Sequence, residues 1–288
     1  MEEKIPYGLS IEQLSAWHRD GFLVIPDWWD SEQVDLLNTV SRRLLSEFNP
    51  PTDGVSVFST EEQTNTADAY FLGSGDKVRY FFEPGALDTG GRLIKPKEIA
   101  INKIGHALHE LVDEFRIITM ECPRVKQVCR SLGFKNCLVP QSMLICKPPH
   151  IGGRVKPHVD GAFLYTEPQS VVGFWWPLET CTLTNGCLWA VPGSHLGGVQ
   201  RRFKRTPGED ATEFDPPMEG APFNLTGAVP LEIAAGSLVL LHSSVVHFSE
   251  ANVSSVSRFA FSIHVVEGNF IWLKDNWLQR STPFPVLY

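Results

Sequence analysis

The spacing of apolar residues changes near Leu138, and this change limits the possible folds more than any other feature of the chain. Before Leu138 several segments have helical spacing. After it come short runs rich in Val, Leu, Phe and Trp, separated by Gly, Pro, Asn and Ser, which are typical of an antiparallel β-sandwich or barrel. Helices followed by strands, with no βαβ alternation and no G-x-G-x-x-G or P-loop motif, argue against Rossmann and P-loop enzymes. The clearest predicted strands lie within residues 139–149, 171–179, 187–195, 236–242 and 258–267.

The first third of the chain is predicted to be helical with one early strand. Residues 10–21 have helical spacing, residues 22–29 form a short apolar run typical of a strand, and a second helix begins at residue 30 or 31 and ends near residue 48. Residues 52–76 are polar and rich in Gly, Ser and Thr, so we expect a long loop. One side of the second helix carries the apolar residues Val34, Leu36, Leu37, Val40, Leu44 and Leu45.

Three further elements are predicted before the strand-rich part. Residues 78–84 are expected to form a strand, and residues 122–134 a short helix that Gly133 ends. Residues 101–118 carry apolar side chains at positions 104, 108, 111 and 115, which is helical spacing. Because the sequence shows no internal repeat and no linker with a change of composition, we expect one domain over residues 1–288.

Composition narrows the class of protein. With 43% hydrophobic residues the chain can bury a sizeable core. Its net charge is −8 and it has no Lys/Arg-rich run, so we expect no nucleic-acid partner, and its longest apolar runs are far shorter than the ~20 residues of a membrane span. The polar start MEEKIPYGLS is unlike a secretory signal, and the six cysteines form no C-x-x-C pair. We therefore expect a cytosolic protein with free thiols; the sequence does not predict an oligomeric state.

The segment KPHVDGAFLYTEP carries the first chemical signal. His158 and Asp160 are separated by one residue, and on an extended segment such residues point to the same side. Two histidines and one carboxylate on an open face are the site of non-haem Fe(II) oxygenases. The H-x-D pair alone is weak, because a lone histidine in a β-region is usually a structural residue. A distal histidine is needed.

Two histidines follow the predicted strand 236–242, and Arg258 decides between them. An Fe(II) oxygenase that uses 2-oxoglutarate must pair the far carboxylate of this cosubstrate, and the planar guanidinium of Arg suits a carboxylate. Arg258 lies 11 residues after His247, far enough to return on a neighbouring strand, and Ser249 offers a hydroxyl on the same face as His247. We therefore predict that His247 is the ligand and that His242 is a supporting or strand-end residue.

The sequence resembles the phytanoyl-CoA dioxygenase family over nearly its whole length. The shared segments are SGDKVRYFFEPGA, INKIGHALH, QSMLICKPPHIGG, PHVDGAFLYTEP, NGCLWAVPGSH, VVHFS and the tail NWLQ…PFP. The resemblance implies a mainly β fold with flanking helices, the double-stranded β-helix or jelly-roll (cupin-like) barrel, that binds Fe(II) and 2-oxoglutarate.

Position by position, the resemblance implies a complete site. Without it, Lys103 would be a solvated charge at a helix end and Trp175 a core aromatic residue, and both alternatives remain open at this point. Gln141 is a plausible polar neighbour of this site. The implied metal ligands are His158, Asp160 and His247, and the implied cosubstrate-binding residues are Lys103, Met143, Trp175, Ser249 and Arg258.

The expected activity is the oxidation, most simply the hydroxylation, of a small-molecule substrate. O2 and 2-oxoglutarate are consumed, succinate and CO2 are released, and ascorbate serves as reductant. Asp160 argues against halogenation, for which a small residue takes the place of the carboxylate. The aromatic segments 163–165 and 174–176 could wall an apolar cavity, and the acidic net charge argues mildly against binding CoA phosphates. The alternatives are a non-catalytic scaffold and a cupin-like Zn or Mn protein, which would need neither Arg258 nor Lys103.

Overall fold

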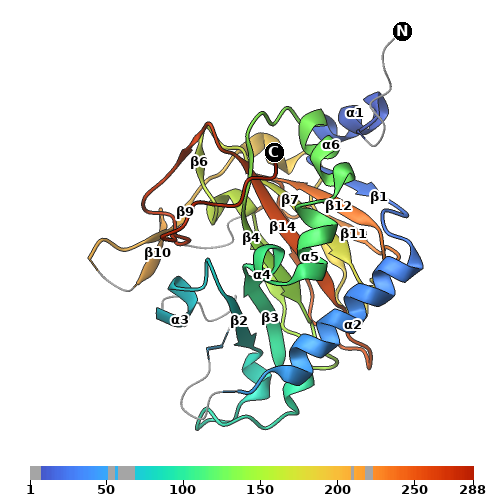
Figure 1. Cartoon of the computed structure of the whole chain (residues 1–288), viewed down its shortest axis with the longest axis vertical. Coiled ribbons are helices and arrows are strands. Elements are labelled where there is room, and N and C mark those ends of the chain that lie inside the picture. The colour runs from blue at the N-terminus through green and yellow to red at the C-terminus, as the bar shows by residue number, and fades with distance from the viewer. Residues whose placement is uncertain (1–7, 51–55, 58–68, 209–210, 218–222) are drawn as a thin grey trace.

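Two antiparallel sheets form the body of the protein in a computed structural model, which describes residues 8–50, 56–57, 69–208, 211–217 and 223–288 (Figure 1). The large sheet has the strand order β1 (Phe22–Ile25), β12 (Leu238–His242), β7 (Val172–Pro177), β14 (Ala260–Glu267), β4 (Cys137–Ile145), β3 (Ile101–His106) and β2 (Val78–Phe82). The small sheet has the order β11 (Val229–Leu231), β8 (Leu188–Ala190), β13 (His247–Ser249) and β5 (Val155–His158).

From β4 onward the chain passes back and forth between these sheets, except that β8 and β11 both lie in the small one. The strands β4, β7, β12 and β14 belong to the large sheet, while β5, β8, β11 and β13 belong to the small one. Winding of this kind defines the jelly-roll, or double-stranded β-helix, and the predicted fold is confirmed. Two short pairs lie outside these sheets, namely β9 (Arg202–Arg205) with β10 (Thr212–Asp215), and β6 (Thr166–Glu167) with β15 (Ile271–Trp272).

Alternation along the strands divides the apolar side chains between two cores. On β12, Leu238 and Leu240 face the helices, whereas Val239 and Leu241 belong to the core between the sheets. Successive side chains of a strand point to opposite faces, so one apolar run serves both layers. The continuous apolar runs after Leu138 therefore come from strands buried on both faces.

Helices cover the outer face of the large sheet (Figure 1). Ser10 and Asp30 cap the first two helices through their side chains, and Gly21 ends the first at φ 77°. The predicted apolar side of the second helix is correct except for Leu36, which is 49% exposed. The short helix expected at 122–134 is confirmed. The main helices are α1 (Ile11–Asp20), α2 (Ser31–Glu47), α5 (Asp113–Thr119) and α6 (Pro123–Ser131), and the short ones are α3 (Ala69–Leu72), α4 (Leu108–Leu111) and the 3₁₀ turns η1 (Pro84–Ala86), η2 (Lys97–Ile99), η3 (Asp160–Ala162) and η4 (Ser194–Gly197).

The prediction of one helix over residues 101–118 is wrong. Its first six residues form β3, which pairs with both β2 and β4, and only the later residues are helical, in α4 and α5. The apolar spacing that suggested one helix combined Ile104 of β3 with Leu108 of α4 and Phe115 of α5, and all three are buried. Short apolar runs do not separate strand from helix by periodicity alone, and pairing with two neighbours decides in favour of a strand here.

The remaining predicted elements are close to those observed. The strand expected at 22–29 is shorter, and the expected strand at 78–84 is β2. The segment 52–76, predicted to be a loop, contains the helix α3, and much of it lies outside the described residues. All six cysteines are unpaired. Among the described residues no helix is long and apolar enough to cross a bilayer.

Candidate active site

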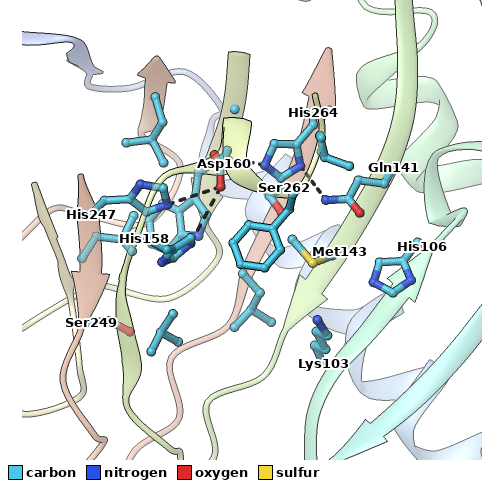
Figure 2. A pocket seen from close by; sticks show the side chains of 18 of the residues that line it. Lys103, His106, Gln141, Met143, His158, Asp160, His247, Ser249, Ser262 and His264 are labelled. Carbon is cyan, nitrogen blue, oxygen red and sulfur yellow. Dashed lines mark hydrogen bonds and ion pairs between the residues drawn. The ribbon is translucent and has the colours of Figure 1, made fainter. Parts of the chain in front are cut away.

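The inward face of the large sheet arranges polar residues in rows across its strands. On β14, Ser262 lies between Trp175 of β7 and Met143 of β4. One row further, His264 lies between Gly173 and Gln141. Residues separated by two positions share a face. The strand pairing thus places Met143, Trp175 and Gln141 on the wall of the same cavity, as Figure 2 shows for Met143 and Gln141.

Three of the predicted residues come together at one end of this cavity. His158 of β5 and His247 of β13 are cross-strand partners, and their ring centroids lie 4.2 Å apart. Asp160 follows at the start of η3, with its Oδ1 atom 3.8 Å from Nε2 of His158 and 3.5 Å from Nε2 of His247 (Figure 2). One possible ligand atom from each of the three residues lies within 4.8 Å of the other two, and this spacing suits one metal ion.

Backbone carbonyls orient both imidazoles. Nδ1 of His158 lies 2.8 Å from the carbonyl of Lys156, and Nδ1 of His247 lies 3.1 Å from that of Val245. A carbonyl oxygen only accepts, so each Nδ1 carries a proton, and each Nε2 points toward Asp160. Desolvation and the neighbouring His247 lower the pKa of His158 to about 4, so this imidazole is neutral at neutral pH. A metal site requires oriented histidine ligands, and these two carbonyl contacts supply the orientation.

Gly173 leaves the space that the carboxylate of Asp160 occupies. A Cβ atom at Gly173 would lie 2.9 Å from Oδ2 of Asp160, closer than real contacts of this kind. Burial by itself raises the pKa of the Asp160 carboxyl, but His247 and His264 outweigh it, and the pKa lies below its ordinary value. Asp160 is therefore ionised at neutral pH and can serve as a metal ligand.

His264 is a site residue that the sequence did not predict. Its Nε2 atom lies 3.2 Å from Oδ2 of Asp160, and its Nδ1 atom lies 3.1 Å from the amide nitrogen of Gln141 (Figure 2). The amide donates to Nδ1, so the proton on Nε2 faces the carboxylate. The signal was present, because His264 is six residues after Arg258 in one predicted strand and so shares its face.

Arg258 lies at the other end of the cavity and is 1% exposed. Its Nε donates to the carbonyl of Gly186 at 3.2 Å, and its guanidinium lies 5.2 Å from the ring centroid of Trp175. Nη1 is buried without a hydrogen-bond partner, and no carboxylate among the described residues lies within 4.0 Å of the guanidinium. A buried, incompletely satisfied guanidinium in a cavity suits an anionic ligand.

The other predicted residues also line the cavity. Ser249 is buried on β13, and Lys103 is buried on β3, with its Nζ 5.6 Å from the ring centroid of Phe81. Lys103 is thus no solvated charge at a helix end, and burial lowers its pKa to about 7. Trp175 lines the cavity and also belongs to the core between the sheets.

Aromatic side chains form much of the wall of the cavity, whose volume is about 230 Å³. Segment 163–165 contributes Phe163 and Leu164, and segment 174–176 contributes Phe174 and Trp175. Trp176 packs outside the barrel, stacked on Trp29. Aromatic side chains also reach the candidate metal ligands, because the ring centroid of Phe163 lies 5.9 Å from that of His158. Further aromatic lining residues are Phe71, Phe203, Phe214 and Trp277.

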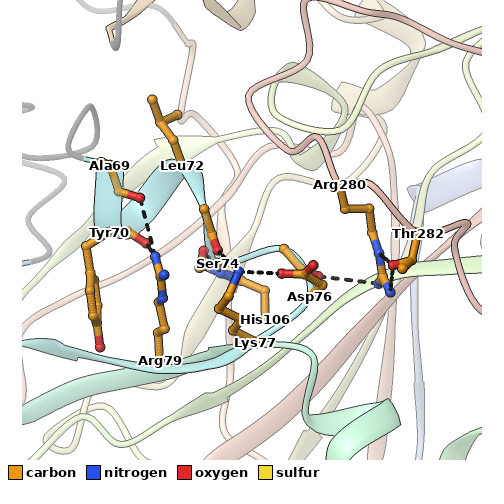
Figure 3. A network of polar contacts seen from close by, with 12 residues as sticks. Ala69, Tyr70, Leu72, Ser74, Asp76, Lys77, Arg79, His106, Arg280 and Thr282 are labelled. Carbon is orange, nitrogen blue, oxygen red and sulfur yellow. Dashed lines mark hydrogen bonds and ion pairs between the residues drawn. The ribbon is translucent and has the colours of Figure 1, made fainter.

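His106 is a second lining residue that the sequence did not predict, because it lies in the segment mistaken for a helix. Ser74 Oγ donates to the carbonyl of Phe71 at 2.6 Å and lies 2.7 Å from Nδ1 of His106 (Figure 3). The hydroxyl has one proton, so it accepts from Nδ1, and Nε2 of His106 keeps a lone pair. Burial holds the pKa of His106 well below its ordinary value, so it is a neutral hydrogen-bond acceptor.

His242 lies apart from this group. Its ring packs against His195 at 5.1 Å and against Trp17 at 5.7 Å, at the end of β12. The structure places His242 at a strand end and brings His247 to Asp160.

Comparison with known proteins identifies the family. The sequence profile described as phytanoyl-CoA dioxygenase matches residues 17–260. Two relatives are a phytanoyl-CoA dioxygenase of Arabidopsis thaliana, 42% identical with 97% of each chain covered, and phytanoyl-CoA dioxygenase domain-containing protein 1 of Bos taurus, 43% identical with 97% of this chain and 99% of the relative covered. The chain belongs to the phytanoyl-CoA dioxygenase family. It is an oxidoreductase of the dioxygenase class.

Solved structures share the fold at low sequence identity. The α-ketoglutarate-dependent epimerase SnoN, in complex with Fe³⁺, α-ketoglutarate and nogalamycin RO, aligns with a TM-score of 0.63 at 17% identity, covering 96% of this chain and 98% of SnoN. EctD from S. alaskensis, with 2-oxoglutarate and 5-hydroxyectoine, aligns with a TM-score of 0.62 at 18% identity, covering 96% of this chain and 85% of EctD. Both support the jelly-roll assignment.

Proposed function

We propose that this dioxygenase holds Fe(II) through His158, Asp160 and His247 and uses 2-oxoglutarate and O2 to oxidise a small-molecule substrate. The main support for the proposal is that one cavity contains both a group of possible metal ligands and a buried guanidinium. At one end, two imidazole nitrogens and a carboxylate oxygen lie within 4.8 Å of one another. At the other, a buried guanidinium has an unpartnered nitrogen. A dicarboxylate that chelates the metal through its keto-acid end and meets Arg258 with its far carboxylate satisfies both.

The residues of the chain bind and orient the reactants. His158, Asp160 and His247 would hold the ion, each through one ligand atom. Arg258 and Ser249 hold the far carboxylate. Bound iron with its cosubstrate supplies the oxidising power, with release of succinate and CO2, and ascorbate keeps the metal reduced.

The apolar wall favours hydroxylation of a C–H bond on a mostly apolar small molecule. Phe163, Phe203 and Phe214 exclude water from the reacting end, which limits side reactions. The SnoN and EctD complexes hold small molecules in the same fold. Within the cavity, His106 Nε2 and the unpartnered Oε1 of Gln141 are two acceptors that a polar group of the substrate can reach.

Turnover of 2-oxoglutarate tests the proposal. Purified protein with Fe(II) and ascorbate should release succinate slowly without added substrate, because a complete cosubstrate site supports uncoupled turnover. His247→Ala should abolish the release, while His242→Ala, which removes an imidazole outside the site, should retain it. No succinate from wild-type protein with full iron occupancy would favour the non-catalytic scaffold. Tight Zn or Mn binding with no effect of Arg258→Ala on 2-oxoglutarate would favour the cupin-like alternative.

A further inference from the structure

A second buried cation lies beside Arg258. Lys147 follows β4, is 2% exposed and has φ 35°. Its Nζ atom donates to the carbonyl of Gly153 at 2.9 Å and to Oγ of Ser249 at 2.9 Å. Its own carbonyl accepts the backbone N–H of Arg258 at 3.2 Å. Lys147 therefore contacts both residues that the proposed function assigns to the far carboxylate.

Two glycines form the channel in which the Lys147 side chain lies. A Cβ atom at Gly152 would lie 2.8 Å from Cγ of Lys147, and one at Gly186, which has φ 79°, would lie 3.1 Å from Cδ and still closer to Cε. The carbonyl of Gly186 also accepts from Arg258. The backbone around this lysine is thus shaped to bring its ammonium to Ser249.

The contact with Lys147 fixes the direction of the Ser249 hydroxyl. An ammonium group only donates, so Ser249 Oγ accepts from it, and the single hydroxyl proton must point elsewhere. Ser249 is 1% exposed and lines the cavity, and no acceptor for this proton is found among the described residues. The proton is therefore available to an acceptor inside the cavity.

The positive charges of Lys147 and Arg258 also lack carboxylate partners nearby. No carboxylate of the described chain lies within 4.0 Å of the ammonium of Lys147 or the guanidinium of Arg258. The buried carboxyl of Glu83 accepts from the backbone of Gly153 at 3.1 Å, and burial raises its pKa to about 7, so it compensates only part of this charge. Burial and Arg258 lower the pKa of Lys147 to about 7, and a bound anion would favour its charged form. Two buried cations without an ion pair call for an anionic ligand.

We propose that Lys147 is a positioning residue for the cosubstrate: it orients the Ser249 hydroxyl toward the far carboxylate of 2-oxoglutarate and adds a second positive charge behind it. This inference rests on the proposed function and assigns the far-carboxylate site to three residues, Lys147, Ser249 and Arg258. The metal end is independent of Lys147.

Binding of two keto acids to the full-length protein tests this role. With Mn(II) in place of iron and without O2, calorimetry gives the dissociation constants of 2-oxoglutarate and of pyruvate, which has the chelating end but lacks the far carboxylate. Lys147→Met should weaken 2-oxoglutarate by about 10- to 100-fold, because a charged hydrogen bond is lost at a buried site, and should leave pyruvate and Mn(II) binding unchanged. Lys95→Met, which removes an exposed lysine, should change neither.

Ser249→Ala provides the second variant, because it removes the oriented hydroxyl without burying a new group. It too should weaken 2-oxoglutarate selectively. An equal loss of both keto acids in Lys147→Met would show a general distortion of the cavity and overturn the proposal, as would wild-type affinity for 2-oxoglutarate in Lys147→Met or in Ser249→Ala. If the wild-type protein itself bound 2-oxoglutarate no more tightly than pyruvate, the proposed function would fail instead.

Discussion

His264 and Asp160 are joined across the inside of the barrel, with Nε2 of His264 3.2 Å from Oδ2 of Asp160. The two carboxylate oxygens thus have different partners, because Oδ1 faces His158 and His247. Gln141 continues the chain by donating to Nδ1 of His264. An outer residue that bonds the second oxygen of a ligating carboxylate fixes the direction of the first, and such partners influence metal affinity strongly.

His264→Leu should therefore weaken binding of the metal to the protein. We expect a loss of about 10- to 100-fold in affinity for Mn(II), measured by calorimetry, because Asp160 loses the donor that orients it. His242→Leu is the matched control and should leave the affinity unchanged. Equal affinities of the wild-type and His264→Leu proteins would show that Asp160 is held without His264.

Gly173→Ala tests the space around the same carboxylate. The new Cβ atom would lie 2.9 Å from Oδ2 of Asp160 and 3.4 Å from Cβ of Leu241, so the carboxylate must move. We expect loss of iron binding with a folded barrel, checked by metal analysis and circular dichroism. Gly197→Ala is the control, because a Cβ atom at Gly197 would have no neighbour within 4 Å. Full iron content in Gly173→Ala would show that Gly173 does not confine the carboxylate of Asp160.

Arg258→Ala should weaken 2-oxoglutarate and leave the metal bound. Truncating one partner of a buried hydrogen-bonded ion pair costs ~2–5 kcal/mol, which corresponds to a rise of ~30-fold or more in the dissociation constant. Arg258→Lys should restore only part of the affinity, because a point charge cannot reproduce the guanidinium fork. If Arg258 served only to tie its strand to the barrel, the melting temperature would fall while the folded variant bound 2-oxoglutarate normally.

The buried imidazole of His109 should make the stability of the protein depend on pH. Burial lowers its pKa to about 4 from 6.5, and its Nε2 donates to the carbonyl of Val139 at 3.0 Å. Because the folded pKa is depressed below the unfolded one, the unfolded chain binds the proton first. The contribution of His109 to the free energy of unfolding is therefore complete above pH 6.5. As the pH falls toward 4, the protein loses roughly 3 kcal/mol of this free energy.

Urea unfolding of wild-type and His109→Gln proteins between about pH 7.5 and 4 measures this contribution. The wild-type free energy of unfolding should fall more steeply with acid than that of His109→Gln, in which the titrating imidazole is absent. Parallel curves for the two proteins would rule out His109 as the source of the acid sensitivity.

The sequence grouped His158, Asp160, His247 and Arg258 from local spacing, and the structure places all four around one cavity. The interval between His158 and Asp160, and that between His247 and Arg258, reflects strand geometry and a single turn, so residue numbers were enough. The helices of the first third were also predicted from local spacing, and the structure shows that the side chains of Ser10 and Asp30 cap them.

The predictions that failed depended on pairing between distant segments. Whether Ile104 belongs to a helix or a strand is decided by β2 and β4, which are separated from it in sequence. His106 was missed for the same reason. The contacts of Lys147 with Ser249 and of His264 with Asp160 join residues about 100 positions apart, and no spacing rule predicts them. The resemblance placed Lys103 in the site where spacing alone did not.

The most direct test is anomalous diffraction at the iron edge from crystals grown without O2 in Fe(II) and 2-oxoglutarate. We expect one iron peak between His158, Asp160 and His247, with the keto-acid end of 2-oxoglutarate on the metal and its far carboxylate against Arg258. A peak at His242, His195 or the cysteines, or a far carboxylate remote from Arg258, would contradict the proposed site.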